Sequence, residues 1–322
     1  MKSPLLARKT VTFKCYFLRY TFAFAQQMVY YTIKAIVTNM YKTSIKHVLY
    51  MFNTIMNLIL ASFSKEVFLE IISVNITKGG CGKTTTVQML GEILGKVYGK
   101  KVLCIDTDPQ CNLSSVSGIN LMDCQEHNLY TLLKGDSTLD ECILKSKYYD
   151  IIPGSLLLAY SDIEFNQLGR EYLLKEKIEH ADYDVVLIDT PPALGLLNIM
   201  SLTASTRIII PTECSYLSMI GLDQLSSTIA SVRKHSNTNL QISGILMVKY
   251  NSRTTLNNIV LDGLKKMAAR MNTHVFDEKI RETVRVREGQ SQCIPLLDWD
   301  GKCSAVSDYL VFTKSFINTL DL

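Results

Sequence analysis

The segment at residues 77–85, TKGGCGKTT, most constrains what this chain can fold into. It lies between a short β-branched run and a helix-forming stretch, which is the context that a phosphate-binding loop needs. The usual pattern G-x-x-x-x-G-K-[ST] has a glycine six residues before its lysine. Thr77 stands at that place, and a second lysine, Lys78, follows it. The segment therefore resembles a phosphate loop, but one that carries two lysines.

The residue types of this loop suit a nucleotide and a divalent cation. Its glycines allow backbone N–H groups to approach phosphate oxygens, and the following helix directs its positive end at the same anion. A lysine after the last glycine neutralises the β and γ phosphates, and the next hydroxyl ligates Mg²⁺. We therefore predict a nucleotide contact at Gly79, Gly80, Cys81, Gly82, Lys83, Thr84 and Thr85.

Three carboxylates support this interpretation because each lies at or just beyond the end of a predicted strand. Asp106 and Asp108 occur in VLCIDTDPQCN, and Asp189 ends the apolar run VVLIDTPP. Buried carboxylates are costly unless a cation or a hydrogen-bond network uses them. We predict that Thr84, Asp106 and Asp189 surround Mg²⁺, with Asp189 in the manner of a Walker B aspartate.

The rest of the chain after residue 69 alternates strands and helices. We predict strands over residues 71–75, 101–106, 185–189, 207–211, 242–249 and 274–280, and helices over 84–98, 216–235, 254–271 and 304–320. Runs such as YDVVLIDT and RIIIP are apolar on both faces, as in central strands of a parallel sheet. The sequence thus predicts an α/β fold: a doubly wound, mostly parallel sheet with helices on both faces and the ligand at the carboxyl ends of the strands.

The first 68 residues differ from the rest in composition. They hold nine Lys or Arg and one acid, so that the net charge of +4 hides a body with 25 basic and 29 acidic residues. The most apolar run, residues 48–63, is shorter than the ~20 residues of a membrane span. Lys65, Glu66 and Val67 can be encoded by a ribosome-binding sequence, with Leu69 as a TTG start codon. We expect residues 1–68 to be translated upstream sequence or a disordered extension, and residues 69–322 to form the domain that carries the P-loop.

Five segments together resemble the ParA/Soj-type partition ATPases of the ParA/MinD group, which have a deviant Walker A loop. They are KGGCGKTT, DTDPQCN, YDVVLIDTPPALGLL, RIIIPTECSYLSMIGLDQL and VRVREGQSQCIP, in the order and spacing of that family. The resemblance covers essentially all of residues 69–322. It implies a P-loop NTPase fold, ATP and Mg²⁺ as cofactors, and slow ATP hydrolysis that DNA and a partner stimulate.

The resemblance also assigns roles to the two lysines. In this family ATP is sandwiched between two subunits, and the first lysine of the loop reaches the partner's nucleotide. Carried over, Lys78 would serve the neighbouring site of a homodimer and Lys83 its own. Asp108 matches the acid that orients water, and Asp106 and Asp189 match the acids around Mg²⁺. Lys78, Lys83 and Asp108 are thus the expected catalytic residues.

Further partners follow from the same resemblance. Family members bind DNA non-specifically through arginines, and Arg253 and Arg285 match those positions, with Arg287, Lys249 and Lys265 as neighbours. Contacts between arginine and phosphate give affinity without sequence specificity. The resemblance implies a ParB-type centromere-binding partner and a cytoplasmic, nucleoid-associated protein that moves a plasmid or chromosome.

The sequence departs from the family pattern at several positions. The family usually has glycine at Cys111 and asparagine at Met200, and Arg281, Glu282 and Thr283 replace residues of the adenine side. Three alternatives remain open. They are a MinD-like positioning ATPase at the membrane, a nucleotide-gated regulator without turnover, and an iron–sulfur ATPase using Cys124 and Cys142. The C-terminal segment has one lysine and two aspartates, unlike a basic amphipathic membrane helix.

Overall fold

The computed structural model describes residue 54, residues 69–251 and residues 256–320. Its central feature is an eight-stranded sheet in the order β3-β4-β2-β5-β1-β6-β7-β8. Every neighbouring pair runs parallel except β3 with β4. The strands are β1 (Glu70–Val74), β2 (Val102–Asp106), β3 (Leu144–Lys145), β4 (Asp150–Ile152), β5 (Val185–Asp189), β6 (Arg207–Glu213), β7 (Gln241–Tyr250) and β8 (Val275–Arg281).

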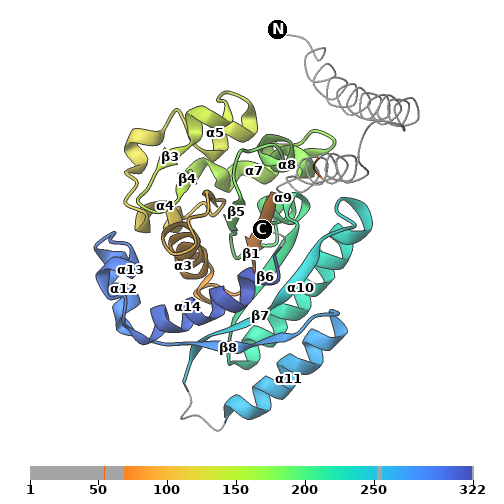
Figure 1. Ribbon diagram of the computed structural model, residues 1–322. Helices are drawn as coiled ribbons and strands as arrows, with labels where there is room; N and C mark the ends of the chain where they lie inside the picture. Colours follow the sequence, from red (N-terminus) through yellow and green to blue (C-terminus); the bar gives the residue numbers. More distant parts are fainter. Residues whose placement is uncertain (1–53, 55–68, 252–255, 321–322) are drawn as a thin grey trace, which may run out of the picture. The chain divides into compact units, whose positions relative to one another are not determined.

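Helices connect these strands, as Figure 1 shows. The longer ones are α3 (Lys83–Lys96), α9 (Leu196–Ala204), α10 (Tyr216–His235), α11 (Leu256–Arg270), α12 (Val284–Ser291) and α14 (Ser304–Ile317). Shorter α-helices are α4 (Asn112–Val116), α5 (Leu129–Lys134), α6 (Leu139–Cys142), α7 (Ser161–Glu164), α8 (Leu173–Ile178) and α13 (Leu296–Trp299). The described part of the chain also has three 3₁₀-helices: η1 (Leu121–Cys124), η2 (Leu156–Tyr160) and η3 (Arg170–Tyr172).

Both faces of the sheet are covered, which explains its apolar strands. On β1, Ile72 and Val74 point into a core with α3 and α14, while Ile71 points into a core with α5, α8 and α9. Towards β7, the second face is covered by α10 and α11, through residues such as Ile208 and Met247. Successive side chains of a strand alternate between faces, so a strand covered twice must be apolar throughout.

The strand order brings the predicted acids to one edge. In the register of the sheet, Asp106 of β2 is the partner of Asp189 of β5, and Asp189 is the partner of Val74 of β1. All three strands run in the same direction, so their carboxyl ends lie together with the loop that follows β1. This edge is where a doubly wound sheet binds its ligand.

The α/β fold predicted from the sequence is confirmed. Each of the predicted strands is present, with ends shifted by at most two residues, and β5 and α10 have the predicted bounds. The strands β3 and β4 and the short helices between residues 112 and 178 were not predicted. The predictions for residues 1–68 lie outside the described residues, apart from residue 54. Among the described residues, no helix has both the length and the apolar composition to span a bilayer.

Candidate nucleotide site

The loop after β1 takes a conformation that needs glycine at two positions. Gly80 and Gly82 have φ of 75° and 72°, in the left-handed region that residues with a Cβ rarely adopt. Gly82 is also the N-cap of α3, so the helix begins at Lys83 with its free N–H groups facing the loop. The loop and the helix dipole thus form a site for an anion.

Lys83 is the buried cation of this site. Its side chain is 7% exposed, and its Nζ makes no hydrogen bond or ion pair within the described part of the chain. Burial lowers the pKa of this ammonium, although Asp189 and Asp108 act in the opposite direction. A buried charge without a partner is costly, so the arrangement suits a polyanion that supplies the missing partner.

Thr84 and Asp189 meet beside Lys83. The Thr84 hydroxyl donates to Asp189 Oδ2 at 2.6 Å, while Asp189 Oδ1 is buried and has no hydrogen-bond partner among the described residues. Burial, with the added charge of Asp106, raises the pKa of Asp189 well above its usual range. A buried carboxylate with one oxygen unused fits a divalent cation. Mg²⁺ is usually held by one or two protein groups together with phosphate and water oxygens.

The other two acids, Asp106 and Asp108, make different contacts. Asp106 Oδ2 accepts hydrogen bonds from the Ser114 N–H and hydroxyl at 2.8 and 2.7 Å, and burial raises the pKa of Asp106 to about 6. Asp106 therefore holds the start of α4 and does not line the cavity. Asp108 does line it, and its Oδ1 accepts from the Gln110 N–H at 2.9 Å. Of these two acids, Asp108 is the one placed to contact a ligand.

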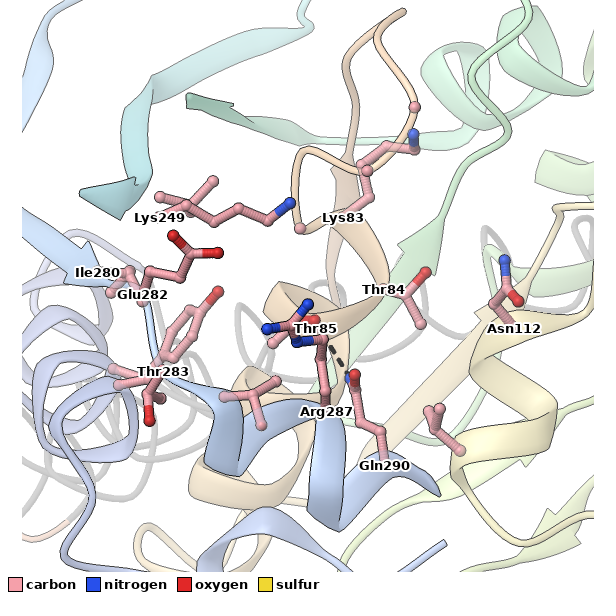
Figure 2. A pocket seen from close by; sticks show the side chains of 18 of the residues that line it. Lys83, Thr84, Thr85, Asn112, Lys249, Ile280, Glu282, Thr283, Arg287 and Gln290 are labelled. Carbon is pink, nitrogen blue, oxygen red and sulfur yellow. Dashed lines mark hydrogen bonds between the residues drawn. The ribbon is translucent and has the colours of Figure 1, made fainter. Parts of the chain in front are cut away.

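Lys83, Thr84 and Asp108 line a cavity of about 470 Å³, whereas Asp189 lies buried behind Thr84 (Figure 2). The cavity extends from the loop to the end of β8 and to α12 and α14. The lining that the sequence did not assign includes Asn112, Val116, Val248, Ile280, Val286, Gln290, Ala305 and Tyr309. Gln290 Nε2 donates to Thr85 Oγ1 at 3.2 Å, so α12 is tied to the first turn of α3. Val286 and Gln290 belong to α12, which was not predicted, and the others belong to α4, β7, β8 and α14, where no local motif marks a residue that faces the cavity.

The three residues that depart from the family pattern on the adenine side all line this cavity. Arg281 is held in place by Asp308, with its Nη2 at 2.7 Å from Oδ1. Glu282 follows the end of β8, and Thr283 caps α12 by accepting from the Arg285 N–H. This end of the cavity therefore offers a carboxylate and a hydroxyl.

Lys78 is held at the edge of the site by an acid that the sequence did not single out. Its Nζ lies 2.6 Å from Glu213 Oε2 and 3.2 Å from Ser215 Oγ, and it is not part of the cavity lining. Glu213 Oε1 also pairs with Lys249 Nζ at 2.9 Å. Burial raises the pKa of Glu213, but the two lysines outweigh it and leave that pKa below its usual value.

Two of the residues expected to bind DNA line the nucleotide cavity. Arg253 lies outside the described residues, and Lys265 is exposed on α11. Arg285 is exposed on α12 and pairs with Glu288 and Asp300, whereas Arg287 lines the cavity. Lys249 also lines the cavity and pairs with Glu213, whereas Arg285 is not part of the cavity lining.

Cys111 and Met200, which also depart from the family pattern, both lie in described parts of the structure. Cys111 has φ 52° and ψ 36°, so a residue with a Cβ takes the left-handed conformation that glycine adopts most easily. Met200 is buried in α9, and the asparagine of that helix that reaches the end of β1 is Asn198. It exchanges hydrogen bonds with the Asn75 side chain at 3.0 and 3.2 Å.

The cysteines of the iron–sulfur alternative are used inside the fold. Cys124 and Cys142 are buried, and their thiols donate to the carbonyls of Asn120 and Asn128. In the described part of the chain, no three His, Cys, Asp or Glu side chains form a group that would hold a metal on their own.

The family is shown by comparison with known proteins. Residues 69–242 match the AAA domain family. Soj, the sporulation initiation inhibitor protein of Bacillus subtilis, is 37% identical over 250 residues, covering 76% of this chain and 97% of Soj. The chain belongs to the ParA/Soj-type partition ATPases. The chromosome partitioning protein ParA of Caulobacter vibrioides is 34% identical over 257 residues, covering 78% of this chain and 94% of ParA.

A solved structure has the same arrangement as this ParA/Soj-type chain. Cobyrinic acid a,c-diamide synthase from Mycobacterium smegmatis, solved with bound ADP and magnesium, is 29% identical with a TM-score of 0.67. The match covers 78% of this chain and 94% of the synthase. The P-loop ATPase fold and the partition family, both expected from the sequence, are thus confirmed.

Proposed function

We propose that this partition ATPase binds ATP with Mg²⁺, dimerises around the nucleotide and coats DNA non-specifically, until a ParB-type partner triggers hydrolysis. It would act in the cytoplasm, on the nucleoid, to move a plasmid or chromosome. The observation that carries the proposal is the buried Lys83, which has no partner among the described residues, near the unused Asp189 Oδ1. Lys83 lacks an anion and Asp189 Oδ1 lacks a cation, and ATP with Mg²⁺ would supply both.

Each residue has a task that its position supports. Lys83 and the N–H groups of the loop bind the phosphates, and Thr84 and Asp189 hold the cation. Mg²⁺ neutralises charge that develops on the phosphates during transfer. Asp108 faces the cavity and orients the attacking water. Phosphoryl transfer depends mainly on positioning and on stabilisation of charge. The groups named above would supply both, but one further cation is still needed to stabilise the charge of the transition state.

Lys78 is the candidate for that further cation, supplied to the partner's site. It lies outside its own cavity, at the edge of the loop. Beside it, the start of α10 exposes Tyr216, Leu217 and Ile220, at 72%, 64% and 46%. A Cβ at Gly221 would lie 2.5 Å from Thr77 Oγ1, so this part of α10 packs on the loop. An apolar patch next to the lysine supports self-association at this face.

The membrane alternative has less support. The apolar face of α14 is already used, since Val306, Tyr309, Phe312 and Phe316 are buried in the core with α3 and β8. A helix that binds a bilayer surface needs a free apolar face. By contrast, the proposed DNA-binding surface is available, because its residue Arg285 on α12 is exposed.

Nucleotide-gated DNA binding tests the proposal. The full chain is titrated onto a labelled random-sequence duplex with ATP and Mg²⁺, with ADP, or without nucleotide, at several salt concentrations. We expect binding with ATP that weakens steeply with salt, and little binding with ADP. Arg285→Glu should weaken it, while Lys134→Glu in α5 makes the same charge change at another exposed site and should not. Equal binding in all three nucleotide states would refute the proposal.

A further inference from the structure

Two arginines of α12 lie on different faces of that helix. A helix turns about 100° per residue, so Arg285 and Arg287 are separated by about 200°. Thr283, Val286, Arg287 and Gln290 have the spacing of one helix face, and all four line the nucleotide cavity. Arg285 instead pairs with Glu288 Oε2 at 2.9 Å and with Asp300 Oδ2 at 3.4 Å. Of these two arginines, only Arg287 lines the cavity.

The cavity face of α12 is fixed to the phosphate loop. Gln290 donates to Thr85 Oγ1 and to Gln88 Oε1, at 3.2 and 2.9 Å, which ties the helix to the first turns of α3. Arg287 lies one turn before Gln290 on the same face, and Figure 2 shows its side chain extending from α12 into the cavity. The stem of Arg287 is therefore anchored close to the residues that follow Lys83.

The charges around the cavity leave Arg287 available. Of the four cations that line the cavity, Lys249 is paired with Glu213 and Arg281 is paired with Asp308. The Lys83 ammonium and the Arg287 guanidinium have no hydrogen-bond or ion-pair partner within the described residues. A guanidinium is planar and donates in a fork that matches phosphate oxygens. The cavity thus holds two unpaired cations, one from the loop and one from α12.

We propose that Arg287 is a nucleotide-binding residue whose guanidinium donates to the phosphate chain of the bound nucleotide, in addition to Lys83. The inference rests on the proposed function, because it needs ATP in this cavity. It removes Arg287 from the DNA surface expected from the sequence and leaves Arg285 there. The two arginines, two residues apart, then serve different ligands.

Equilibrium binding of ATP separates these roles. The full chain, Arg287→Ala, Arg287→Lys and the matched control Arg285→Ala are titrated with a fluorescent ATP analogue, and unlabelled ATP then competes for the site. We expect roughly tenfold weaker ATP binding for Arg287→Ala, since a charge-assisted hydrogen bond is lost. Arg287→Lys should recover part of the affinity, and Arg285→Ala should match the parent. Thermal unfolding without nucleotide should be unchanged, because Arg287 is exposed.

The outcomes distinguish this inference from the proposed function. Parental affinity in Arg287→Ala would overturn the inference alone. Arg287→Ala that unfolds at a lower temperature, with no recovery in Arg287→Lys, would show a structural role and also overturn it. A parent protein that binds no ATP would refute the proposed function, and the inference with it.

Discussion

Glu92 connects α3 to α13, the helix that follows α12, and the protonation of Glu92 should make stability depend on pH. The side chain is 1% exposed on α3 and accepts from the backbone N–H groups of Leu296 and Leu297, at 3.0 and 2.9 Å. Burial raises the pKa of Glu92 from 4.5 to about 7. The hydrogen bonds from Leu296, Leu297 and Gln88 lower this pKa, but burial has the larger effect. The folded protein therefore holds a proton that the unfolded chain releases.

The sign and size of the effect follow from this difference. Between pH 4.5 and 7 the folded state binds more protons than the unfolded state, so the free energy of unfolding falls as pH rises through that range. A pKa change of this size is worth about 3 kcal/mol, at about 1.4 kcal/mol for each pKa unit. Below pH 4.5 the stabilisation is complete, and above about pH 7 it is lost.

The perturbation is Glu92→Gln, which removes the titration and keeps one acceptor oxygen. Urea unfolding of the parent and the variant at pH 5, 6, 7 and 8 gives the difference between their free energies of unfolding. The difference cancels other titrating groups, such as Asp106. We expect the stability of the parent relative to the variant to fall by about 2.5 kcal/mol between pH 5 and pH 8. A difference that stays constant with pH would show that Glu92 is ionised throughout, and would refute the reasoning.

Three other changes test the site. Gly82→Ala should destabilise the nucleotide-free protein by about 1 kcal/mol in thermal unfolding, because φ is 72°, whereas Gly79→Ala, with no atom within 4 Å of the added Cβ, should not. Asp189→Ala should slow ATP hydrolysis by roughly two orders of magnitude and abolish its response to Mg²⁺, since it removes the unused Oδ1; a preserved Mg²⁺ titration would contradict this. Tyr309→Phe should cost about 1 kcal/mol in urea unfolding with little change in ATP affinity, because it removes only the buried bond to Thr86 Oγ1 at 2.9 Å.

The sequence predicted the parts of the fold that have strong local signals. β5 is an apolar run that ends at Asp189, and α10 begins after the Ser215 cap, so both sets of bounds could be read directly. β4 has only three residues and is defined by its register with β2, which no local pattern reveals. Contacts between distant segments decide such elements.

The candidate site likewise has residues that the sequence predicts and residues that only the fold reveals. The loop and its acids lie at strand ends that the sequence marks clearly. Glu213 could not be identified, because its role comes from meeting Lys78 of the loop and Lys249 of β7. Arg285 and Arg287 look equivalent in the sequence, and only the presence of α12 places them on different faces. A role that depends on the direction of a side chain requires the fold.

The central claim is that two subunits share each ATP site, with Lys78 supplied by the partner and Asp108 by the subunit that binds the nucleotide. ATP hydrolysis by a mixture of two inactive variants, Lys78→Ala and Asp108→Ala, tests it most directly. A mixed dimer has one complete site, so an equal mixture should recover about a quarter of the parent rate when subunits pair at random. If Lys78 serves its own site, no site in any dimer is complete, and a mixture as inactive as its components would contradict the account.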